Sequence, residues 1–191
     1  DDVMEHPSSL TFFQNKGQII DDEGALHSEI KYYTNRHAPS LYFSDDLLSY
    51  AWCKIDTTED DDTLARLDMS FVGSNGGKEI HKAVGQPGEY LNYYLAHCPE
   101  GATNVGSSDR LIVSEVYDNV DLEYYFDNAG LKYYIIIKPG WSEQSDPISI
   151  LYEGADEMNI LGGGELEIIT PLGTLTQHVA DAYQIDAMGD L

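Results

Sequence analysis

Positive charge is scarce in this sequence of 191 residues. Ten Lys and Arg residues stand against 34 Asp and Glu residues, which gives a formal net charge of −24 at pH 7. Proteins that bind nucleic acids or anionic lipid surfaces present clustered basic residues to the phosphate groups. Because so few scattered cations cannot build such a cluster, we expect neither a nucleic-acid partner nor docking on an acidic membrane.

Long hydrophobic runs are also absent. No apolar stretch reaches the length of about 18 residues that a membrane-spanning helix requires. The first residues, Asp1, Asp2 and Val3, lack the basic and apolar parts of a signal peptide. We therefore expect no insertion into a membrane, and we expect that any export signal has already been removed.

Cysteine is limited to two residues, Cys53 and Cys98. A disulfide between them would close a long loop and stabilise the fold by about 4 kcal/mol in the chain-entropy model. Two separate thiols are the alternative, and the sequence leaves both open. Without a Cys-x-x-Cys motif, a structural zinc site is not expected.

Helical periodicity is missing, and strand patterns take its place. Short apolar and aromatic runs are separated by Gly, Pro, Asn and Asp, which is typical of strands and turns. In the run 64–71, polar Arg66 and Asp68 alternate with apolar Leu67 and Met69, so one face of the strand should be buried. We predict strands over 41–43, 47–55, 64–72, 90–95, 111–117, 120–126, 131–138, 148–152, 165–170 and 175–179.

Turn residues lie where hairpins would need them. Residues 127–130 separate two apolar runs, so we predict a hairpin with a positive φ angle at Gly130 or Asn128. Turns are also expected at 162–164 and 171–173. The predicted fold class is all-β, an antiparallel β-sandwich or two packed sheets with hairpin connections. We expect one β-rich domain over 10–186, undivided or in two lobes, with a flexible segment at 1–9 and a tail at 187–191.

Tyrosine is abundant, with 14 residues, and it recurs as neighbouring pairs at 32–33, 93–94, 124–125 and 133–134. Neighbours on a strand point to opposite faces, so each pair should place one ring in the core and one outside. Core packing is the simpler explanation of these pairs. The alternative is a surface for stacking sugars or contacting another subunit, formed by Tyr33, Tyr94, Tyr125, Tyr134 and Trp141.

The acidic clusters are candidates for calcium binding. Carboxylates in turns can supply the six to eight oxygen ligands that Ca²⁺ prefers, and Asp60, Asp61 and Asp62 are the candidate site. A solvated acidic surface is the alternative, because no cluster matches a calcium-loop motif. Apart from Ca²⁺ we expect no cofactor.

Catalytic motifs are not found. The six His residues show no His-x-His or His-Glu-x-x-His spacing, and no Gly-x-Ser-x-Gly motif occurs. A glycoside hydrolase needs two facing carboxylates, which Asp121 with Glu123, or Glu165 with Glu167, could supply. Among 34 acids such spacing carries little information. We therefore expect a protein that is not an enzyme, with a glycoside hydrolase as the least favoured alternative.

A series of motifs resembles a known family. In order, they are 12–18 (FFQNKGQ), 30–33 (IKYY), 41–43 (LYF), 91–94 (LNYY), 116–122 (VYDNVDL), 130–134 (GLKYY), 138–140 (KPG), 152–155 (YEGA), 164–166 (GEL) and 182–184 (AYQ). This succession resembles the uncharacterised β-rich domain near the mature N-terminus of large secreted Bacteroidetes proteins. In that family the domain commonly precedes SBBP-type repeats and a sorting domain for type IX secretion.

The resemblance implies an extracellular or cell-surface module without an assigned catalytic residue. No such repeat follows here, so we expect either a fragment of a longer protein or an assembling subunit. Within the motifs, Asn15 and Gly17 should fix a turn, 139–140 should end a strand, and Gly154 should permit a bend beside another strand.

The sequence thus predicts a non-enzymatic module for adhesion or for assembly of a surface structure. Exposed sheet edges would add strands from other copies or other surface proteins, and head-to-tail addition would build a filament. The alternative is a carbohydrate-binding domain that recognises a polysaccharide.

Overall fold

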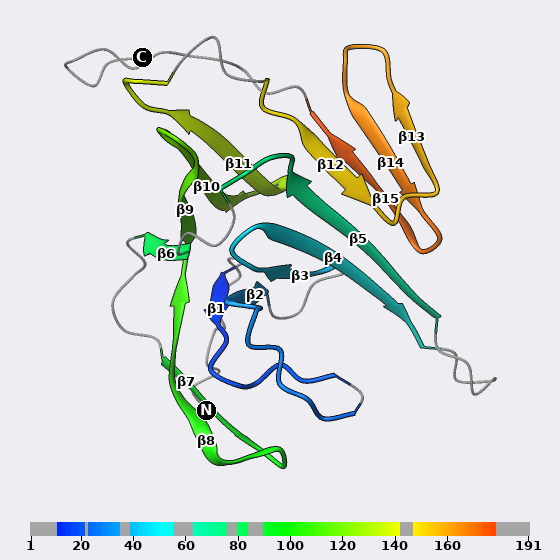
Figure 1. The fold of residues 1–191 in the computed structure, drawn as a ribbon. Helices are drawn as coiled ribbons and strands as arrows, with labels where there is room; N and C mark the ends of the chain where they lie inside the picture. The colour runs from blue at the N-terminus through cyan, green and yellow to red at the C-terminus, as the bar shows by residue number, and fades with distance from the viewer. Residues whose placement is uncertain are drawn as a thin grey trace.

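Figure 1 shows a computed structural model of the chain, which describes residues 11–21, 23–34, 39–55, 63–75, 80–83, 90–141 and 147–178, with the backbone alone at 80–83. These residues form strands, and none of them belongs to a helix that could cross a membrane. The strands are β1 (Phe12–Gln14), β2 (Tyr32–Thr34), β3 (Ser40–Phe43), β4 (Leu47–Lys54), β5 (Thr63–Phe71), β6 (Ile80–Ala83), β7 (Tyr90–Leu95), β8 (Cys98–Ser108), β9 (Arg110–Tyr117), β10 (Val120–Asp127), β11 (Gly130–Ile137), β12 (Ile150–Glu153), β13 (Glu157–Ile160), β14 (Leu166–Thr170) and β15 (Gly173–Gln177). The predicted all-β class is confirmed.

The strands form three antiparallel sheets. The largest has eight strands in the order β12-β5-β4-β3-β2-β1-β8-β7, the second has the order β11-β10-β9-β6, and the third has the order β13-β14-β15. Consecutive strands are mostly neighbours, so hairpins make most of the connections, as predicted. The predicted segments 1–9 and 187–191 lie outside the described residues.

Both smaller sheets cover the same face of the eight-stranded sheet. Alternation along β5 points Leu67, Met69 and Phe71 to that face, and all three are buried. Met69 and Phe71 belong to the core beneath the four-stranded sheet, whereas Leu67 packs with Ile168 of β14 in a second core. The molecule therefore has two layers, with two small sheets side by side over one large sheet (Figure 1).

Aromatic rings fill the larger core. The Phe12 ring lies edge-on to Phe43, with centroids 5.2 Å apart, and stacks on Phe126 at 4.8 Å. Phe43 in turn contacts Tyr124 of β10 at 5.2 Å. Burying each such side chain contributes about 1.5–3 kcal/mol, so these rings hold the four-stranded sheet against the large one.

The predicted turns are observed. Asp127 and Gly130 close the β10–β11 hairpin with a two-residue turn, and Gly130 has a φ angle of +125°. Thr170 and Gly173 close the β14–β15 hairpin in the same way. A further turn connects β13 to β14, where Gly163 has a φ angle of +106°.

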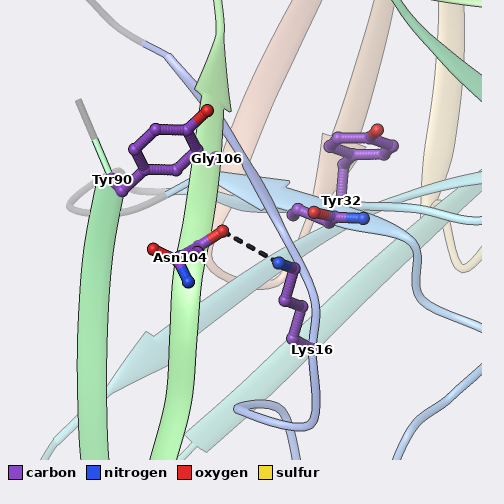
Figure 2. Close-up of a pocket in the computed structure, with 6 residues that line it drawn as sticks. Lys16, Tyr32, Tyr90, Asn104 and Gly106 are labelled. Carbon is purple, nitrogen blue, oxygen red and sulfur yellow. Dashed lines mark hydrogen bonds between the residues drawn. The ribbon is translucent and has the colours of Figure 1, made fainter. Parts of the chain in front are cut away.

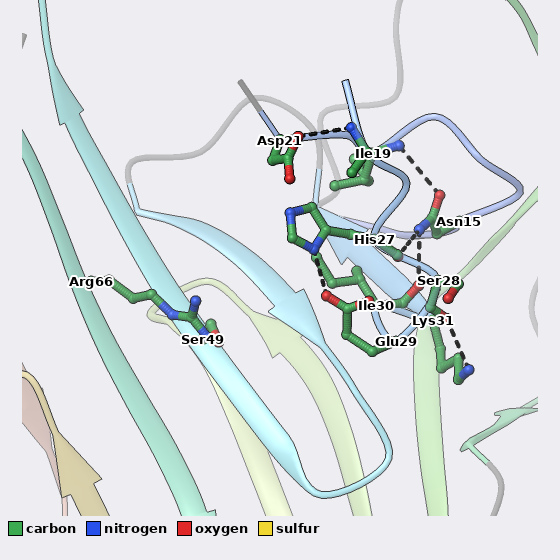
Figure 3. A network of polar contacts seen from close by, with 11 residues as sticks. Asn15, Ile19, Asp21, His27, Ser28, Glu29, Ile30, Lys31, Ser49 and Arg66 are labelled. Atoms are coloured by element: carbon green, nitrogen blue, oxygen red, sulfur yellow. Dashed lines mark hydrogen bonds and ion pairs between the residues drawn. The ribbon is translucent and has the colours of Figure 1, made fainter. Parts of the chain in front are cut away.

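The turn predicted at Asn15 and Gly17 is stabilised by the Asn15 side chain (Figure 3). Its oxygen accepts hydrogen bonds from the backbone N–H groups of Gly17 and Gln18 at 3.0 and 3.1 Å. Its nitrogen donates to the carbonyls of His27 and Ile30, each at 2.9 Å. One amide therefore joins both ends of the loop between β1 and β2.

The longest strand was not predicted. β8 contains Pro99, Gly101 and Asn104, residue types that are depleted in strands. Its first part pairs with β7, and its last two residues, Ser107 and Ser108, pair with β1. The β7–β8 hairpin thus extends from the body as an arm (Figure 1).

Candidate functional site

The outer edge of β11 is the candidate site. β11 pairs with β10 over all eight of its residues, without a bulge. On its other side, no strand among the described residues pairs with it. An edge of this kind presents unpaired N–H and C=O groups, which are a template for another strand.

The hairpin geometry fixes which backbone groups point outward. Asp127 and Gly130 flank a two-residue turn and form a hydrogen-bonded pair, and the pattern repeats at every second residue. The N–H of Lys138 donates to the Asn119 carbonyl at 2.8 Å, which agrees with this alternation of hydrogen-bonded pairs. The even-numbered residues of β11 therefore bond to β10. The outward groups belong to Leu131, Tyr133, Ile135 and Ile137.

Apolar side chains lie at the end of this edge. The exposed fractions of Ile135, Ile136 and Ile137 are 37%, 36% and 52%. Successive side chains of a strand point to opposite faces, so both faces of β11 are apolar here. Lys132 is the single charged residue of the strand. In a chain with a net charge of −24, this edge carries no carboxylate.

An aromatic and cationic row lies on the outer face of the same sheet. Tyr125 and Tyr134 stack with ring centroids 4.9 Å apart, and the Tyr125 hydroxyl donates to that of Tyr134 at 2.8 Å. The Arg110 guanidinium lies 5.6 Å from the Tyr125 centroid and forms an ion pair with Glu123. The hydrogen bond to Glu123 raises the pKa of Arg110. The structure thus brings together two of the predicted surface tyrosines.

Tyr33 was wrongly predicted to point outward. It is buried on the face of β2 opposite the core, where its ring lies 6.0 Å from Phe13. Its hydroxyl donates to the Tyr93 hydroxyl at 3.1 Å and accepts from the Gln18 amide at 3.5 Å. Burial, then the hydrogen bond to Tyr93, raise the pKa of Tyr33. The loop after β1 and the strand β7 cover this ring, which alternation within β2 cannot reveal.

The other two predicted surface residues lie apart from each other. Tyr94 on β7 has an exposed fraction of 76%, and its ring covers Gly101, where an added β-carbon would lie 3.0 Å from the Tyr94 ring. Trp141 follows the turn that ends β11, as predicted for 139–140, and its N–H donates to the Lys138 carbonyl at 3.3 Å. Of the two, only Trp141 is near the β11 edge in the chain.

A second candidate site is a hollow between the first strands and the β7–β8 arm. It has a volume of about 420 Å³ and is lined by Gln14, Lys16, Tyr32, Tyr90, Asn104 and Gly106. The Lys16 ammonium donates to the Asn104 carbonyl at 2.8 Å. Figure 2 shows this contact with the rings of Tyr90 and Tyr32 to either side. We call this hollow the arm groove, and none of its lining residues is acidic.

The carboxylates proposed for a hydrolase hold structural contacts. Asp121 pairs with the Lys138 ammonium at 2.5 Å, and Glu123 pairs with Arg110. On the small sheet, Glu165 contacts the His178 ring at 2.6 Å, and Glu167 accepts from the Asn159 amide at 3.3 Å. These contacts give each acid a role in joining strands or loops.

The cysteine and calcium predictions have different outcomes. Cys53 and Cys98 are both free cysteines, so of the two alternatives the structure has the separate thiols. The candidate calcium ligands Asp60, Asp61 and Asp62 lie outside the described residues. Within the described part of the chain, no three His, Cys, Asp or Glu side chains are grouped to hold a metal.

Several residues of the β11 edge and the arm groove were not predicted from the sequence. The cation of Arg110, the exposed Ile135 and Ile136, and the groove residues Lys16 and Tyr90 were not singled out. The run of three isoleucines in 135–137 was the available signal, since three consecutive apolar residues cannot all face one core.

Comparison with known protein families gives a match over most of the chain. Residues 12–190 match a family model described as Domain of unknown function (DUF7948). No curated protein and no solved structure matches the chain.

Proposed function

This chain belongs to the DUF7948 family of unknown function, and we propose that it is a non-enzymatic module that assembles or adheres through strand addition at the β11 edge. The observation that carries the proposal is the unbroken pairing of β11 on one side together with its open, apolar other side. Strand addition would satisfy the outward backbone groups of β11, and exposed isoleucines would be buried with it.

The contrast with three other edge strands, β7, β12 and β13, supports this choice. Proteins usually protect sheet edges with bulges, charges or short strands. The edge strand β7 has two shifts in its register with β8. The edge strand β13 carries Glu157, and β12 has only four residues and carries Glu153. β11 has eight residues, a regular register and the single charge of Lys132.

Sedimentation of matched variants tests the proposal. Ile135→Pro removes one outward N–H without breaking a bond to β10, because proline is tolerated where the N–H faces solvent. Ile135→Thr keeps the N–H and a β-branched side chain. We expect self-association to be lost in the proline variant and kept in the threonine variant, with both folded by circular dichroism. A monomeric native chain over a wide range of protein, salt and Ca²⁺ concentrations would remove self-assembly.

Carbohydrate binding is the second candidate, and the arm groove favours it. Sugars stack on aromatic rings and hydrogen-bond to amides, and the groove combines Tyr90 with Gln14 and Asn104. Binding of polysaccharides, followed by tyrosine fluorescence, should be lost in Tyr90→Ala. Tyr94→Ala is the matched control, because Tyr94 is an exposed tyrosine of the same strand outside the groove lining. Equal effects of both variants would argue against the groove.

The cellular setting is also part of the proposal. We place the module outside the cell, within a secreted or surface protein of the kind found in Bacteroidetes. The support is the acidic, strand-rich sequence and the succession of motifs described above. Ca²⁺ at 60–62 would offset part of the repulsion between acidic copies. Calorimetric titration with Ca²⁺ of the native chain and of Asp61→Asn tests that site.

A further inference from the structure

The β11 edge is complementary to itself. In an antiparallel pair, hydrogen-bonded residues alternate along the strand, so an added strand must meet Leu131, Tyr133, Ile135 and Ile137 with outward residues of its own. We propose that β11 pairs with β11 of a second copy of this chain about a twofold axis at Tyr134. This inference rests on the proposed strand addition and names its occupant.

The register of the pair follows from which residues of β11 point their N–H and C=O groups outward. With the axis at Tyr134, Leu131 lies opposite Ile137 of the second copy, and Tyr133 lies opposite Ile135 of the second copy. All four outward residues then pair with outward residues. An axis at Ile135 would place Leu131 opposite Pro139, which has no N–H to donate. An axis at Tyr133 would place Ile137 opposite Ala129 in the hairpin turn.

The side chains fit the same register. On the core-facing side, Tyr133 meets Ile135 and Leu131 meets Ile137, which are aromatic–aliphatic and aliphatic pairs that stabilise sheets. On the outer side, Lys132 lies opposite Ile136 of the second copy, so the two lysines do not face each other. Tyr134 lies opposite Tyr134, at the end of the row that contains Tyr125.

Charge supports a second copy as the occupant. Copies that each carry −24 repel one another at long range, and salt screens this repulsion beyond about 10 Å at 0.1 M. Close contact then requires a surface without carboxylates, which β11 provides. Pairing would join two four-stranded sheets into one continuous sheet. A twofold contact closes on itself, so this edge builds a dimer, and a filament would need another edge as well.

Disulfide crosslinking tests the register. At a twofold axis, Tyr134→Cys places two cysteines directly opposite in a non-hydrogen-bonded pair, with Cα atoms about 4.5 Å apart, within disulfide range. Cys53 and Cys98 are first replaced by Ser. Ile136→Cys is the matched control on the same strand and face. Under mild oxidation we expect Tyr134→Cys to form a covalent dimer about tenfold faster than Ile136→Cys.

A mixture of Lys132→Cys and Ile136→Cys chains provides a second readout that leaves Tyr134 in place. It should give crosslinked heterodimers, because these residues face each other across the proposed pair. A native dimer in sedimentation without these crosslinks would overturn the twofold register and leave strand addition standing. A native chain that stays monomeric over a wide range of protein and salt concentrations would overturn the β11–β11 pair and self-assembly with it.

Discussion

Gly154 lies directly against the backbone of Arg66. A β-carbon at Gly154 would be 2.2 Å from the Arg66 carbonyl oxygen, and the φ angle of Gly154 is +94°. Gly154 follows the last residue of β12, where the chain leaves the large sheet for β13. The predicted bend beside a neighbouring strand is confirmed, and both close approach and backbone angle exclude a side chain there.

Gly154→Ala should therefore lower the free energy of unfolding by about 3 kcal/mol, from the strained φ angle and the contact with Arg66. Gly24→Ala is the control, since Gly24 has a similar φ angle of +84° and no atom within 4 Å of an added β-carbon. It should lose only about 1 kcal/mol. Urea unfolding measures both, and equal losses would contradict the close contact.

Gly173→Ala should disturb the packing of the small sheet on the large one. A β-carbon at Gly173 would lie 2.7 Å from the Trp52 indole nitrogen, so the ring must move. We expect a loss of about 1–3 kcal/mol from overpacking and a shift in Trp52 fluorescence emission, measured with Trp141→Phe as background. Gly162→Ala has no neighbour within 4 Å and should leave the emission unchanged.

Asp121→Ala should destabilise the junction of β9 and β10. Glu115 has a φ angle of +53° at an irregular stretch of this pairing, and its N–H donates to the Asp121 carboxylate at 2.8 Å. Removing the carboxylate leaves that N–H and Lys138 without this partner, at a cost of about 2–3 kcal/mol. Asp127→Ala, at the exposed end of the same strand, should cost less than half as much in thermal unfolding.

Alkaline pH should unfold the protein through its buried tyrosines. Burial raises the pKa of Tyr124 above the ordinary tyrosine value of 10.0. Below pH 10 both folded and unfolded chains keep the phenol proton, so this stabilisation is fully present. Above it the unfolded chain ionises first, so the free energy of unfolding falls by about 1.4 kcal/mol per pH unit for each such group, until the folded pKa is reached.

Tyr124→Phe isolates this effect, because it removes one titrating hydroxyl and keeps the ring. Urea unfolding between pH 10 and 11, where the unfolded phenol goes from half to mostly ionised, should show a pH dependence that is weaker by about 1 kcal/mol per pH unit than in the native chain. An unchanged slope would mean that Tyr124 ionises equally in both states.

Local patterns predicted most of the longer strands and missed several short or weakly apolar ones. β5 and β10 follow from alternation, and the hairpin between β10 and β11 follows from Asn128 and Gly130. β8 was missed because its pairing with two different strands overrides weak local propensity. β13 alternates between polar and apolar residues, but it has only four residues and was not predicted.

The sequence predicted less well which side chains are exposed and which are buried, because alternation along a strand does not show what covers each face. Tyr125 and Tyr134 point outward as expected, and their stacking joins neighbouring strands. The same alternation predicts that Tyr33 points outward. Gln18 and Tyr93, from segments that lie elsewhere in the sequence, cover it instead.

The sequence by itself determined the all-β class, the main hairpin turns and the strongly acidic charge, because strand alternation, turn chemistry and ionisable groups are local properties. Tertiary structure decided that β11 is an edge, that the arm groove forms beside Lys16, and that Tyr33 is buried. These features depend on which distant strands pair and which faces they cover. Long-range packing sets both, so the β11 edge became a candidate site only once the sheets were assembled.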